Sequence, residues 1–333
     1  MTWLVTGGAG YIGAHVVRAM VEDGLDVVVI DDLSHGHREF VREGTPFVHA
    51  NLLGGDVVRE TLKTYDVKGV VHLAGFKYAG ESVGRPLHTY TQNVTAMISL
   101  LEAMIGAGVR DMVFSGSAGV YGTPHVDLVT EDTAIAPESP YGETKVIGEW
   151  LLADVARSDG IRYTSLRYFN VVGSSYDDIY DSSPHNLFPK VMKALTDGRT
   201  PVINGDDYPT PDGTPIKDHV HVGDLALAHV AAARALEQGR ELEPVYNLGS
   251  GTGASVREIV EAIRRVSGTD FTPEIGPRRP GDPARIVASD ALAARDLGWK
   301  NRHTIDDMVA SAWKSWNRRF GDPASRFGDP SSR

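Results

Sequence analysis

The 333-residue chain contains no cysteine. Disulfide bonds, thiolate nucleophiles and cysteine-ligated metals are therefore excluded. Basic residues are also scarce relative to acidic ones: 33 lysines and arginines face 44 aspartates and glutamates, for a formal net charge of −11. A surface with this balance repels the phosphates of nucleic acids and of acidic membranes, so we expect neither as a partner.

The sequence also lacks a long hydrophobic run. No apolar stretch approaches the ~20 residues needed to span a bilayer, and no basic segment followed by an apolar one marks a signal peptide. We therefore expect a soluble cytoplasmic protein. The closest pairs among the 12 histidines, His35/His37 and His219/His221, stand two residues apart, which by itself is a weak metal-binding pattern. We expect no metal site.

What the sequence does have is a glycine-rich stretch near its start. Gly7, Gly10 and Gly13 follow the apolar run 3–5 and precede the helix-like stretch 14–22. A strand, a glycine turn and a helix lay a pyrophosphate on backbone N–H groups at a helix N-terminus. A second apolar strand, 27–30, ends in Asp31, 18 residues after Gly13, near the spacing at which a carboxylate binds the adenosine ribose. Since this carboxylate would repel a 2′-phosphate, the pattern predicts NAD rather than NADP.

Short apolar runs alternate with helical stretches through the first half of the chain. Further strands are expected at 46–48, 70–73, 112–115 and 164–167, with helices at 56–66, 86–107 and 140–158. This alternation predicts a parallel sheet covered by helices on both faces, with ligands at the carboxyl ends of its strands. The expected fold class is α/β, a Rossmann-type doubly wound parallel sheet with a smaller C-terminal α/β substrate domain.

The pattern changes after about residue 172. Polar, Gly- and Pro-rich loops alternate with helices expected at 187–197, 222–238, 255–266 and 304–319. We interpret 1–173 as the NAD-binding domain, joined by 216–235 and 244–250, with the strand 245–248 returning to the large sheet. Residues 174–333 would form the substrate-binding domain. Its end, 320–333, is a seven-residue unit written nearly twice, and this Gly/Pro/Ser composition predicts disorder.

Tyr141 and Lys145 are candidates for acid–base chemistry. Ser139 and Pro140 before them are typical of a helix N-cap and first helical position, which places Tyr141 and Lys145 one turn apart on one helix face. A nearby ammonium, like the positive nicotinamide ring of oxidised NAD, lowers the pKa of a tyrosine from ~10 and makes it a usable base near neutrality. Ser117 follows the carboxyl end of the fifth expected strand, 112–115, where its hydroxyl can hydrogen-bond a reacting hydroxyl.

Together these motifs make the chain resemble the UDP-glucose 4-epimerases, a family of extended short-chain dehydrogenases/reductases. The similarity runs from residue 2 to about residue 316. It is carried by the segments 5–13 (VTGGAGYIG), 72–77 (HLAGFK), 80–83 (GESV), 139–145 (SPYGETK), 166–170 (LRYFN), 205–214 (GDDYPTPDGT), 246–249 (YNLG) and 278–282 (RRPGD). The segment 205–214 is the most specific of these, because it lies in the expected substrate domain.

The resemblance implies an isomerase that inverts C4 of UDP-glucose and UDP-galactose through a transient 4-keto sugar, with reversible hydride transfer to bound NAD and no metal. Tyr141 would take the proton of the 4-hydroxyl, directly or through Ser117, and Lys145 would orient the nicotinamide ribose. The implied cofactor-binding residues are Gly7, Gly10, Tyr11, Ile12, Gly13, Asp31, Asp32, Asn51, Leu52, Leu73, Ala74, Gly75, Lys77, Asn93, Ser115, Tyr141, Lys145 and Tyr168. The implied substrate-binding residues are Lys77, Ser117, Tyr141, Phe169, Asn170, Asn186, Leu187, Lys217, Arg279, Asp282 and Ile286. The resemblance also implies a homodimer that pairs the helices at 86–107 and 140–158 with those of a second copy.

The chain departs from the family pattern at several positions. Gly116 and Gly119 stand where the family has Ser or Thr, and Asn51 stands where it has Asp. Lys217 replaces an arginine on the diphosphate, which keeps the charge but loses the bidentate geometry. The residue that gates N-acetylated sugars is Ile286 here, rather than tyrosine or a small residue. These changes leave the reaction type intact and concern rate and substrate range.

Other activities remain as alternatives at this point. The first is C4 epimerisation of another UDP-sugar, an N-acetylhexosamine or a pentose. A sugar-nucleotide 4,6-dehydratase is disfavoured, because it needs an Asp-Glu pair where Ala118 and Gly119 follow Ser117. An NADP-dependent reductase is disfavoured by Asp31.

Overall fold

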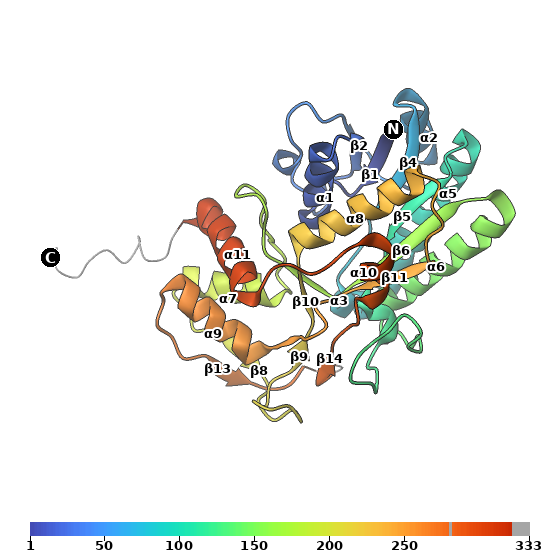
Figure 1. The fold of residues 1–333 in the computed structure, drawn as a ribbon. Coiled ribbons are helices and arrows are strands. Elements are labelled where there is room, and N and C mark those ends of the chain that lie inside the picture. Colours follow the sequence, from blue (N-terminus) through green and yellow to red (C-terminus); the bar gives the residue numbers. More distant parts are fainter. Residues whose placement is uncertain (280–281, 322–333) are drawn as a thin grey trace.

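The computed structural model describes residues 1–279 and 282–321 (Figure 1). Its centre is a seven-stranded parallel sheet in the order β11-β6-β5-β4-β1-β2-β3. The strands are β1 (Thr2–Thr6), β2 (Asp26–Asp31), β3 (Phe47–His49), β4 (Val67–His72), β5 (Asp111–Ser115), β6 (Arg162–Tyr168) and β11 (Val245–Leu248). The chain winds outward from β1 to β3 and then outward from β4 on the other side, so the predicted doubly wound sheet and the return of 245–248 are confirmed. The direction switches between β1 and β4, which is where such sheets bind ligands.

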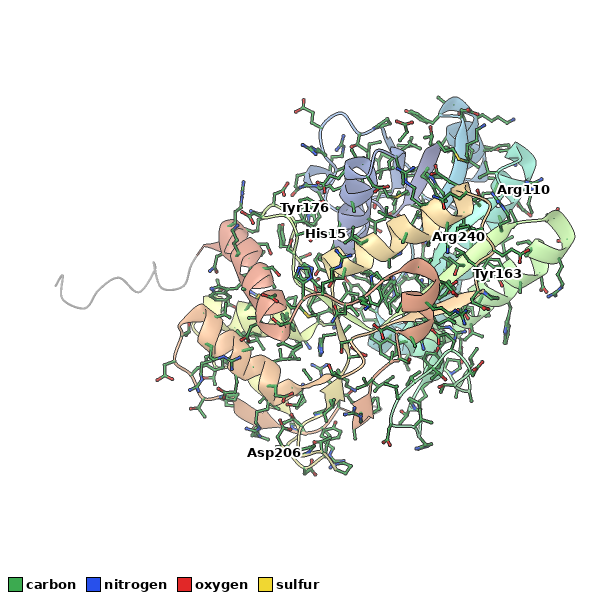
Figure 2. The ribbon with its side chains drawn as sticks, in the orientation of Figure 1. His15, Arg110, Tyr163, Tyr176, Asp206 and Arg240 are labelled. Carbon is green, nitrogen blue, oxygen red and sulfur yellow. The ribbon has the colours of Figure 1, made fainter. Side chains whose placement is uncertain are left out.

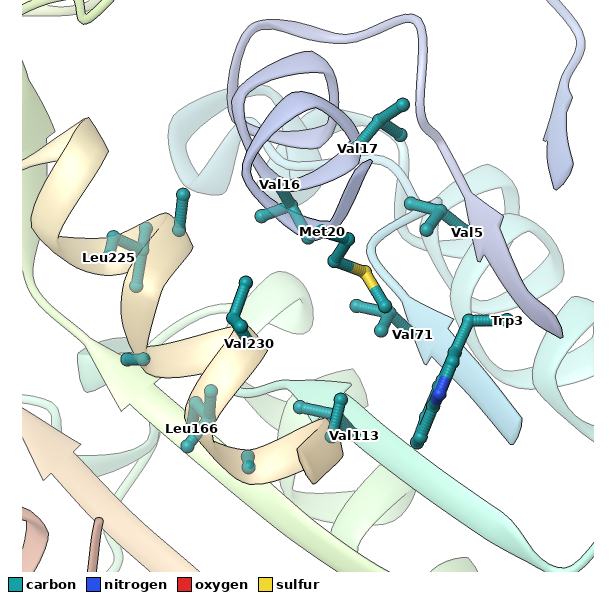
Figure 3. Packing of buried hydrophobic residues seen from close by; sticks show 14 of the residues in the cluster. Trp3, Val5, Val16, Val17, Met20, Val71, Val113, Leu166, Leu225 and Val230 are labelled. Atoms are coloured by element: carbon teal, nitrogen blue, oxygen red, sulfur yellow. The ribbon is translucent and has the colours of Figure 1, made fainter. Parts of the chain in front are cut away.

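Helices cover both faces of the sheet. One face carries α1 (Tyr11–Glu22), α8 (Val222–Glu237) and α10 (Ala291–Leu297), and the other carries α2 (Gly55–Thr64), α5 (Ala96–Ala107) and α6 (Pro140–Asp159). Successive strand residues point to opposite faces: Val5 and Val71 pack with Met20 of α1 (Figure 3), whereas Leu4 and Val70 pack on the other side. Both faces are buried, which is why these strands read as continuous apolar runs.

The later part of the chain forms a smaller lobe with its own core. The helices α7 (Leu187–Thr196), α9 (Val256–Ser267) and α11 (Ile305–Phe320) pack together there. Short strands complete the lobe: β8 (Val202–Asn204) pairs with β13 (Glu274–Gly276), β7 (Asn170–Val172) with β10 (His219–His221), and β9 (Ile216–Lys217) lies between β12 (Ala254–Ser255) and β14 (Arg285–Ile286). The exact domain boundaries given above remain proposals.

Several elements differ from the expectation. The helix expected at 86–107 is divided into α4 (Pro86–Tyr90), a π-helical turn η2 (Thr91–Thr95) and α5. The helix α3 (Ala79–Gly84), the 3₁₀ turns η1 (Arg38–Phe40) and η3 (Ala118–Tyr121), α10 and the shortest strands were not predicted. Phe320 is the last residue of α11, so the prediction of a disordered tail is wrong for that residue, and 322–333 lie outside the described residues.

Helix α1 joins the sheet to the smaller lobe. The Tyr11 hydroxyl donates to the Gly173 carbonyl at 2.6 Å, and His15 Nε2 accepts from the Ser175 N–H at 3.1 Å. The His15 ring also lies against Tyr176, with ring centres 5.4 Å apart (Figure 2). The N-terminal half of this helix therefore faces both the sheet edge and the second lobe.

Within 1–279 and 282–321, no helix combines the length and the apolar character needed to cross a membrane. The same residues contain no group of three or more histidine, aspartate or glutamate side chains arranged to hold a metal ion.

Candidate active site

The glycine turn lies at the carboxyl end of β1, beside the switch in strand order. Gly7 has φ +72°, a left-handed conformation that glycine adopts without strain. A Cβ on Gly7 would lie 2.7 Å from the backbone nitrogen of Ala74, and one on Gly13 would lie 2.0 Å from the Gly7 carbonyl oxygen. Gly10 is the N-cap of α1 and caps it with no side chain. The turn is tight, and the N-terminal N–H groups of α1 are suited to receive an anion.

Asp31 ends β2 next to this turn. Its carboxylate accepts hydrogen bonds from the Ala9 N–H at 2.9 Å and the Leu33 N–H at 2.8 Å. Burial raises the pKa of Asp31, and the two hydrogen bonds act in the opposite direction. The carboxylate therefore braces the glycine turn from the position at which it was predicted to meet an adenosine ribose.

Asp32 and Asn51 form a pair at the same edge of the sheet. Asn51 Nδ2 donates to Asp32 Oδ2 at 2.7 Å, and Ser34 donates to Asp32 Oδ1 through both its N–H and its hydroxyl. Burial raises the pKa of Asp32, but the hydrogen bonds from Ser34 and Asn51 outweigh it and the net shift is downward. The departure from the family pattern at Asn51 thus replaces a second carboxylate with a hydrogen-bond donor to the first. Leu52 is buried in the core beneath.

The loop after β4 runs close to the glycine turn. Thr6 Oγ1 accepts hydrogen bonds from the N–H groups of Leu73 and Ala74, each at 3.2 Å. Gly75 has φ +152°, and a Cβ there would lie 2.9 Å from Asn93 Oδ1. These predicted cofactor residues therefore lie together at the β1/β4 edge.

Asn93 lies on the π-helical turn η2 and ties this loop to α6. Its Oδ1 accepts from the Phe76 N–H at 2.7 Å, and its Nδ2 donates to the Phe76 carbonyl and to Thr144 Oγ1, both at 2.9 Å. All of these hydrogen bonds join groups within the chain. Its predicted contact with a cofactor stays a prediction.

Tyr141 and Lys145 lie on the first turns of α6. Ser139 Oγ accepts from the Gly142 N–H at 3.2 Å and Pro140 begins the helix, so the predicted N-cap is confirmed. Lys145 Nζ lies 5.8 Å from the centre of the Tyr141 ring and donates to the Ser115 carbonyl at 2.8 Å. Ser115 Oγ in turn hydrogen-bonds the Tyr168 hydroxyl. Tyr141, Lys145, Ser115 and Tyr168 thus lie close together at the end of β5.

Ser117 lies beside Tyr141 on the next loop. It caps η3 by accepting from the Gly119 N–H at 3.1 Å. A Cβ on Gly119 would lie 3.3 Å from Ser117 Oγ and 3.6 Å from Cε1 of Tyr141. Gly119 therefore lies directly against Ser117 and the Tyr141 ring, and the Cβ of the larger residue that the family has here would press on the Ser117 hydroxyl.

Gly116 has a different explanation. A Cβ there would lie 2.5 Å from Ser165 Oγ and 2.9 Å from the Leu166 carbonyl oxygen. The neighbouring strand β6 fills this space, so a side chain at 116 would clash. This departure from the family pattern is compensated by Ser165 and does not enlarge the site.

Burial dominates the titration of the catalytic candidates. It raises the pKa of Tyr141, although a hydrogen bond with Ser117 opposes the rise. It lowers the pKa of Lys145 from 10.5 to about 8, against the attraction of Glu149. The prediction of a lowered Tyr141 pKa is therefore wrong for the protein's own groups, because the cost of burying a phenolate is larger than the stabilisation that they give.

A cavity of about 350 Å³ opens between the two lobes at this point. Its wall includes the predicted residues Tyr11, Ile12, Lys77, Tyr141, Tyr168, Phe169, Asn170, Asn186, Leu187, Lys217, Arg279 and Asp282. Ser117 and Ile286 are not among the described residues of the wall. Ile286 instead packs with Ala118 and Phe169 in a small apolar cluster at its edge.

The polar residues predicted to bind substrate are already paired. Asn170 Nδ2 donates to the Asp218 carbonyl at 2.9 Å, and Asn186 Nδ2 to Asp181 Oδ2 at 2.7 Å. Lys217 Nζ lies 2.5 Å from Asp282 Oδ1, forming an ion pair. Burial lowers the pKa of Lys217, and Asp282 opposes the shift. Lys217 and Asp282 were predicted as separate substrate-binding residues. In the structure they form one ion pair.

The cavity wall includes residues that were not predicted from the sequence, among them Asn204 and His185. With its amide oxygen turned toward Arg279, Asn204 accepts from Nε at 2.9 Å and from Nη2 at 3.1 Å. His185 lines the cavity and lies 2.7 Å from Glu81 of α3. Both contacts join segments far apart in the chain, so no local pattern signals them.

The arrangement fits a dinucleotide. The N-terminus of α1 lacks a side-chain cap, Asp31 places a carboxylate beside the turn, and Lys145 places an ammonium at the end of β5. A carboxylate at Asp31 suits a free ribose 2′-hydroxyl, as in NAD, and repels a 2′-phosphate. The donor chemistry is thus that expected for NAD.

Comparison with known proteins agrees with this geometry. The profile of the NAD dependent epimerase/dehydratase family matches residues 3–249. The chain is 43% identical over 323 residues to the UDP-glucose 4-epimerase of Lactobacillus helveticus, covering 96% of this chain and 97% of that one. Its structure is similar to that of the UDP-glucose 4-epimerase from Brucella ovis in complex with NAD, with TM-score 0.91 and 38% identity over 96% of this chain and 98% of the other.

A second solved structure is that of the UDP-glucose 4-epimerase from Bifidobacterium longum in complex with NAD+ and UDP, with TM-score 0.89 and 34% identity over 97% of this chain and 100% of that one. The similarity spans both the sheet and the smaller lobe. On this evidence the chain belongs to the NAD dependent epimerase/dehydratase family, and the three similar proteins named above are UDP-glucose 4-epimerases.

Proposed function

We propose that the protein interconverts UDP-glucose and UDP-galactose by inverting C4, with NAD as its resident cofactor. The observation that carries the proposal is the placement of Tyr141, Ser117 and Lys145 together at the carboxyl edge of the sheet, beside the cavity between the lobes. The near-full-length similarity to UDP-glucose 4-epimerases, two of them solved with NAD, supports the choice of substrate and cofactor.

The residues that would hold NAD follow the sheet edge. The N–H groups at the start of α1 would bind its diphosphate, Asp31 the adenosine ribose and Lys145 the nicotinamide ribose. When bound, NAD accepts a hydride from C4 of the sugar and returns it.

Tyr141 is the general base of this proposal. It takes the proton of the 4-hydroxyl, Ser117 donates a hydrogen bond to the resulting phenolate, and the Lys145 ammonium 5.8 Å from the ring stabilises the negative charge. Lys145 is kept in place by the Ser115 carbonyl. Tyr141 later returns the proton to the C4 oxygen, so the reaction ends with no net change in protonation.

The nucleotide end of the substrate meets the smaller lobe. The Arg279 guanidinium, oriented by Asn204, has the fork geometry that matches a diphosphate. Anchoring the diphosphate there leaves the sugar free to turn within the cavity and present its other face.

We also propose that the protein is a homodimer that works in the cytoplasm. Leu87 of α4 and Trp150 of α6 are 82% and 61% exposed, and large apolar side chains exposed at this level favour burial against a partner. The composition without cysteine suits a reducing compartment.

The direct test is turnover. Purified protein is incubated with a panel of UDP-hexoses, UDP-N-acetylhexosamines and UDP-pentoses without added cofactor, and the C4 epimers are separated. We expect UDP-galactose and UDP-glucose to be the best pair. Conversion of a different UDP-sugar alone, or an absolute need for stoichiometric reduced cofactor, would contradict the proposal.

A further inference from the structure

A buried ion pair lies behind the candidate active site. Glu149 on α6 and Arg167 on β6 have side chains that are only 8% and 4% exposed. Arg167 donates from Nε to Glu149 Oε1 at 2.9 Å and from Nη2 to Oε2 at 2.6 Å, which is a bidentate arrangement. Burying two charges is costly even when they are paired, and apolar side chains of similar size often stabilise a core equally well. Stability alone therefore does not account for the pair.

The pair is connected to each element that carries a catalytic candidate. Glu149 stands one helical turn after Lys145 on α6. On its other side, Arg167 Nη1 donates to the Tyr121 hydroxyl at 2.8 Å. Tyr121 is the last residue of η3, the turn that Ser117 caps.

Two further bonds complete this network. The Tyr121 hydroxyl donates to Asn247 Oδ1 of β11 at 2.8 Å, and Ser165 Oγ of β6 donates to Glu149 Oε1 at 2.8 Å. One set of buried hydrogen bonds thus spans α6, β6, β11 and η3. Networks of this kind fix a single arrangement when all their members are satisfied.

We propose that Glu149 and Arg167 are positioning residues that fix α6 against η3, so that Tyr141 and Lys145 stay aligned with Ser117. The proposal rests on the function assigned above to these three residues. A displacement of about 1 Å in a reacting group can cost on the order of 100-fold in rate. The chemistry therefore requires a rigid spacing between α6 and η3. The buried bidentate ion pair between Glu149 and Arg167 provides it.

Glu149 also acts on Lys145 through its charge. Burial lowers the Lys145 pKa to about 8, and the Glu149 carboxylate holds it up. Other titratable groups near Lys145 include Tyr141 on the same helix and His72 on β4, and Tyr168 on β6 bonds the same Ser115 that Lys145 does. Burial raises the pKa of both tyrosines, and burial followed by repulsion from Lys145 lowers that of His72 to about 3. These three are uncharged near neutrality, so Glu149 is the anion acting on the Lys145 ammonium.

The test begins with a readout that needs no turnover. Glu149→Gln is prepared in the full chain with its cofactor, and the Lys145 Cε resonance of ¹³C-lysine-labelled protein is titrated, assigned with Lys145→Arg. We expect the titration midpoint of Lys145 to move to lower pH in Glu149→Gln. Asp154→Asn is the matched control, because it removes a carboxylate from the same helix at a position 67% exposed, and it should leave the midpoint unchanged.

The second readout separates positioning from folding. In Glu149→Gln we expect kcat to fall about 10–100-fold with little change in KM, since the lost alignment matters in the transition state, and the alkaline limb of the kcat profile should move to lower pH. Arg167→Lys keeps the charge but loses the fork, and should reduce kcat with a smaller shift of Lys145. Circular dichroism verifies that each variant is folded.

Wild-type kcat together with a wild-type Lys145 midpoint in folded Glu149→Gln would overturn the proposal. Unchanged kcat in Arg167→Lys would show that the bidentate geometry of the ion pair is not needed for positioning. If the wild-type protein itself fails to epimerise any UDP-sugar, the proposed function fails, and the NMR titration still decides whether Glu149 controls the charge of Lys145.

Discussion

At the scale of single residues, burial sets the properties of the site. Tyr141 and Lys145 have pKa values shifted in opposite directions, upward for the phenol and downward for the ammonium, because a dry environment disfavours both charges. The Ser117 hydrogen bond and the Glu149 carboxylate partly oppose these shifts. A positive charge placed next to the phenol would therefore have a large effect, which suits a base that is to be activated when the cofactor is oxidised.

Replacing Tyr141 with phenylalanine removes the proposed base while keeping the ring. We expect kcat for UDP-galactose to fall about 10²–10⁴-fold, the usual contribution of a positioned acid–base group. Binding of UDP, measured by calorimetry, should stay close to the wild-type value because the phenol does not contact the nucleotide in this account. A variant with near-normal kcat would exclude Tyr141 as the base.

Ile286 should set the tolerance for an acetamido group at C2 of the sugar. Its side chain packs with Phe169, which lines the cavity. A change of a few methylenes in such a pocket is worth about 10–200-fold in discrimination. Ile286→Ser should raise turnover of UDP-N-acetylglucosamine, Ile286→Tyr should suppress it, and UDP-glucose should change little.

The comparison that decides this point is the kcat/KM of all three proteins on the N-acetyl sugar. Equal values would show that position 286 does not gate the site. Parallel losses on both sugars would point instead to a packing defect around Phe169.

At the scale of secondary structure, the helices and strands that could be predicted are those with a local signal in the sequence. The strands of the large sheet are buried on both faces and read as apolar runs, and Ser139 with Pro140 marks the start of α6. The π-helical turn η2 has no such signal, since Thr91–Thr95 contains neither glycine nor proline. The two-residue strands β9, β12 and β14 exist only because distant segments pair.

The same distinction applies to the site. The closeness of Tyr141 and Lys145 could be predicted, because one helix carries both residues. The contact between Asn204 and Arg279 could not, because it depends on the pairing of β8 with β13. The upward shift of the Tyr141 pKa also could not be predicted, because it reflects how deeply the assembled fold buries the ring.

The outer surfaces of α4 and α6 should form the dimer interface. Trp150→Glu places a charge on a side chain that is 61% exposed in the single chain, so folding should be little affected while association is weakened. Light scattering should give a dimer for the wild type and a monomer for the variant at micromolar concentration. A monomeric wild type would refute the homodimer.

At the scale of the whole molecule, two lobes with separate cores meet at a cavity lined by residues of both. Several histidines are buried in and around this junction. His15 and His72 have pKa values of about 3, and His219, His221 and His229 of about 4, in each case chiefly because of burial. The folded protein therefore keeps these imidazoles neutral well into the acid range.

Stability should fall as the solution is acidified. The folded pKa of each histidine lies below the unfolded value of ~6.5, so the unfolded chain binds protons first as pH drops below that value. Each histidine then lowers the free energy of unfolding by about 1.4 kcal/mol per pH unit until pH reaches its folded pKa. Urea unfolding at about pH 7 and about pH 5.5 measures the difference.

The matched variant is His229→Gln. His229 is fully buried and its Nε2 has no hydrogen-bond partner in the described structure, so it should carry a full share of the acid sensitivity. Its replacement should reduce the dependence of unfolding free energy on pH in this interval. An identical pH dependence in variant and wild type would contradict this assignment.

In the proposed reaction, C4 is inverted by removing and returning the same hydride. The most direct measurement follows the isotope: the protein is incubated in ordinary water with UDP-glucose deuterated at C4, without added cofactor, and the UDP-galactose formed is examined by mass spectrometry and NMR. We expect the product to keep its deuterium at C4. Replacement of that deuterium by hydrogen from water would mean that C4 is deprotonated rather than oxidised, and would refute hydride transfer.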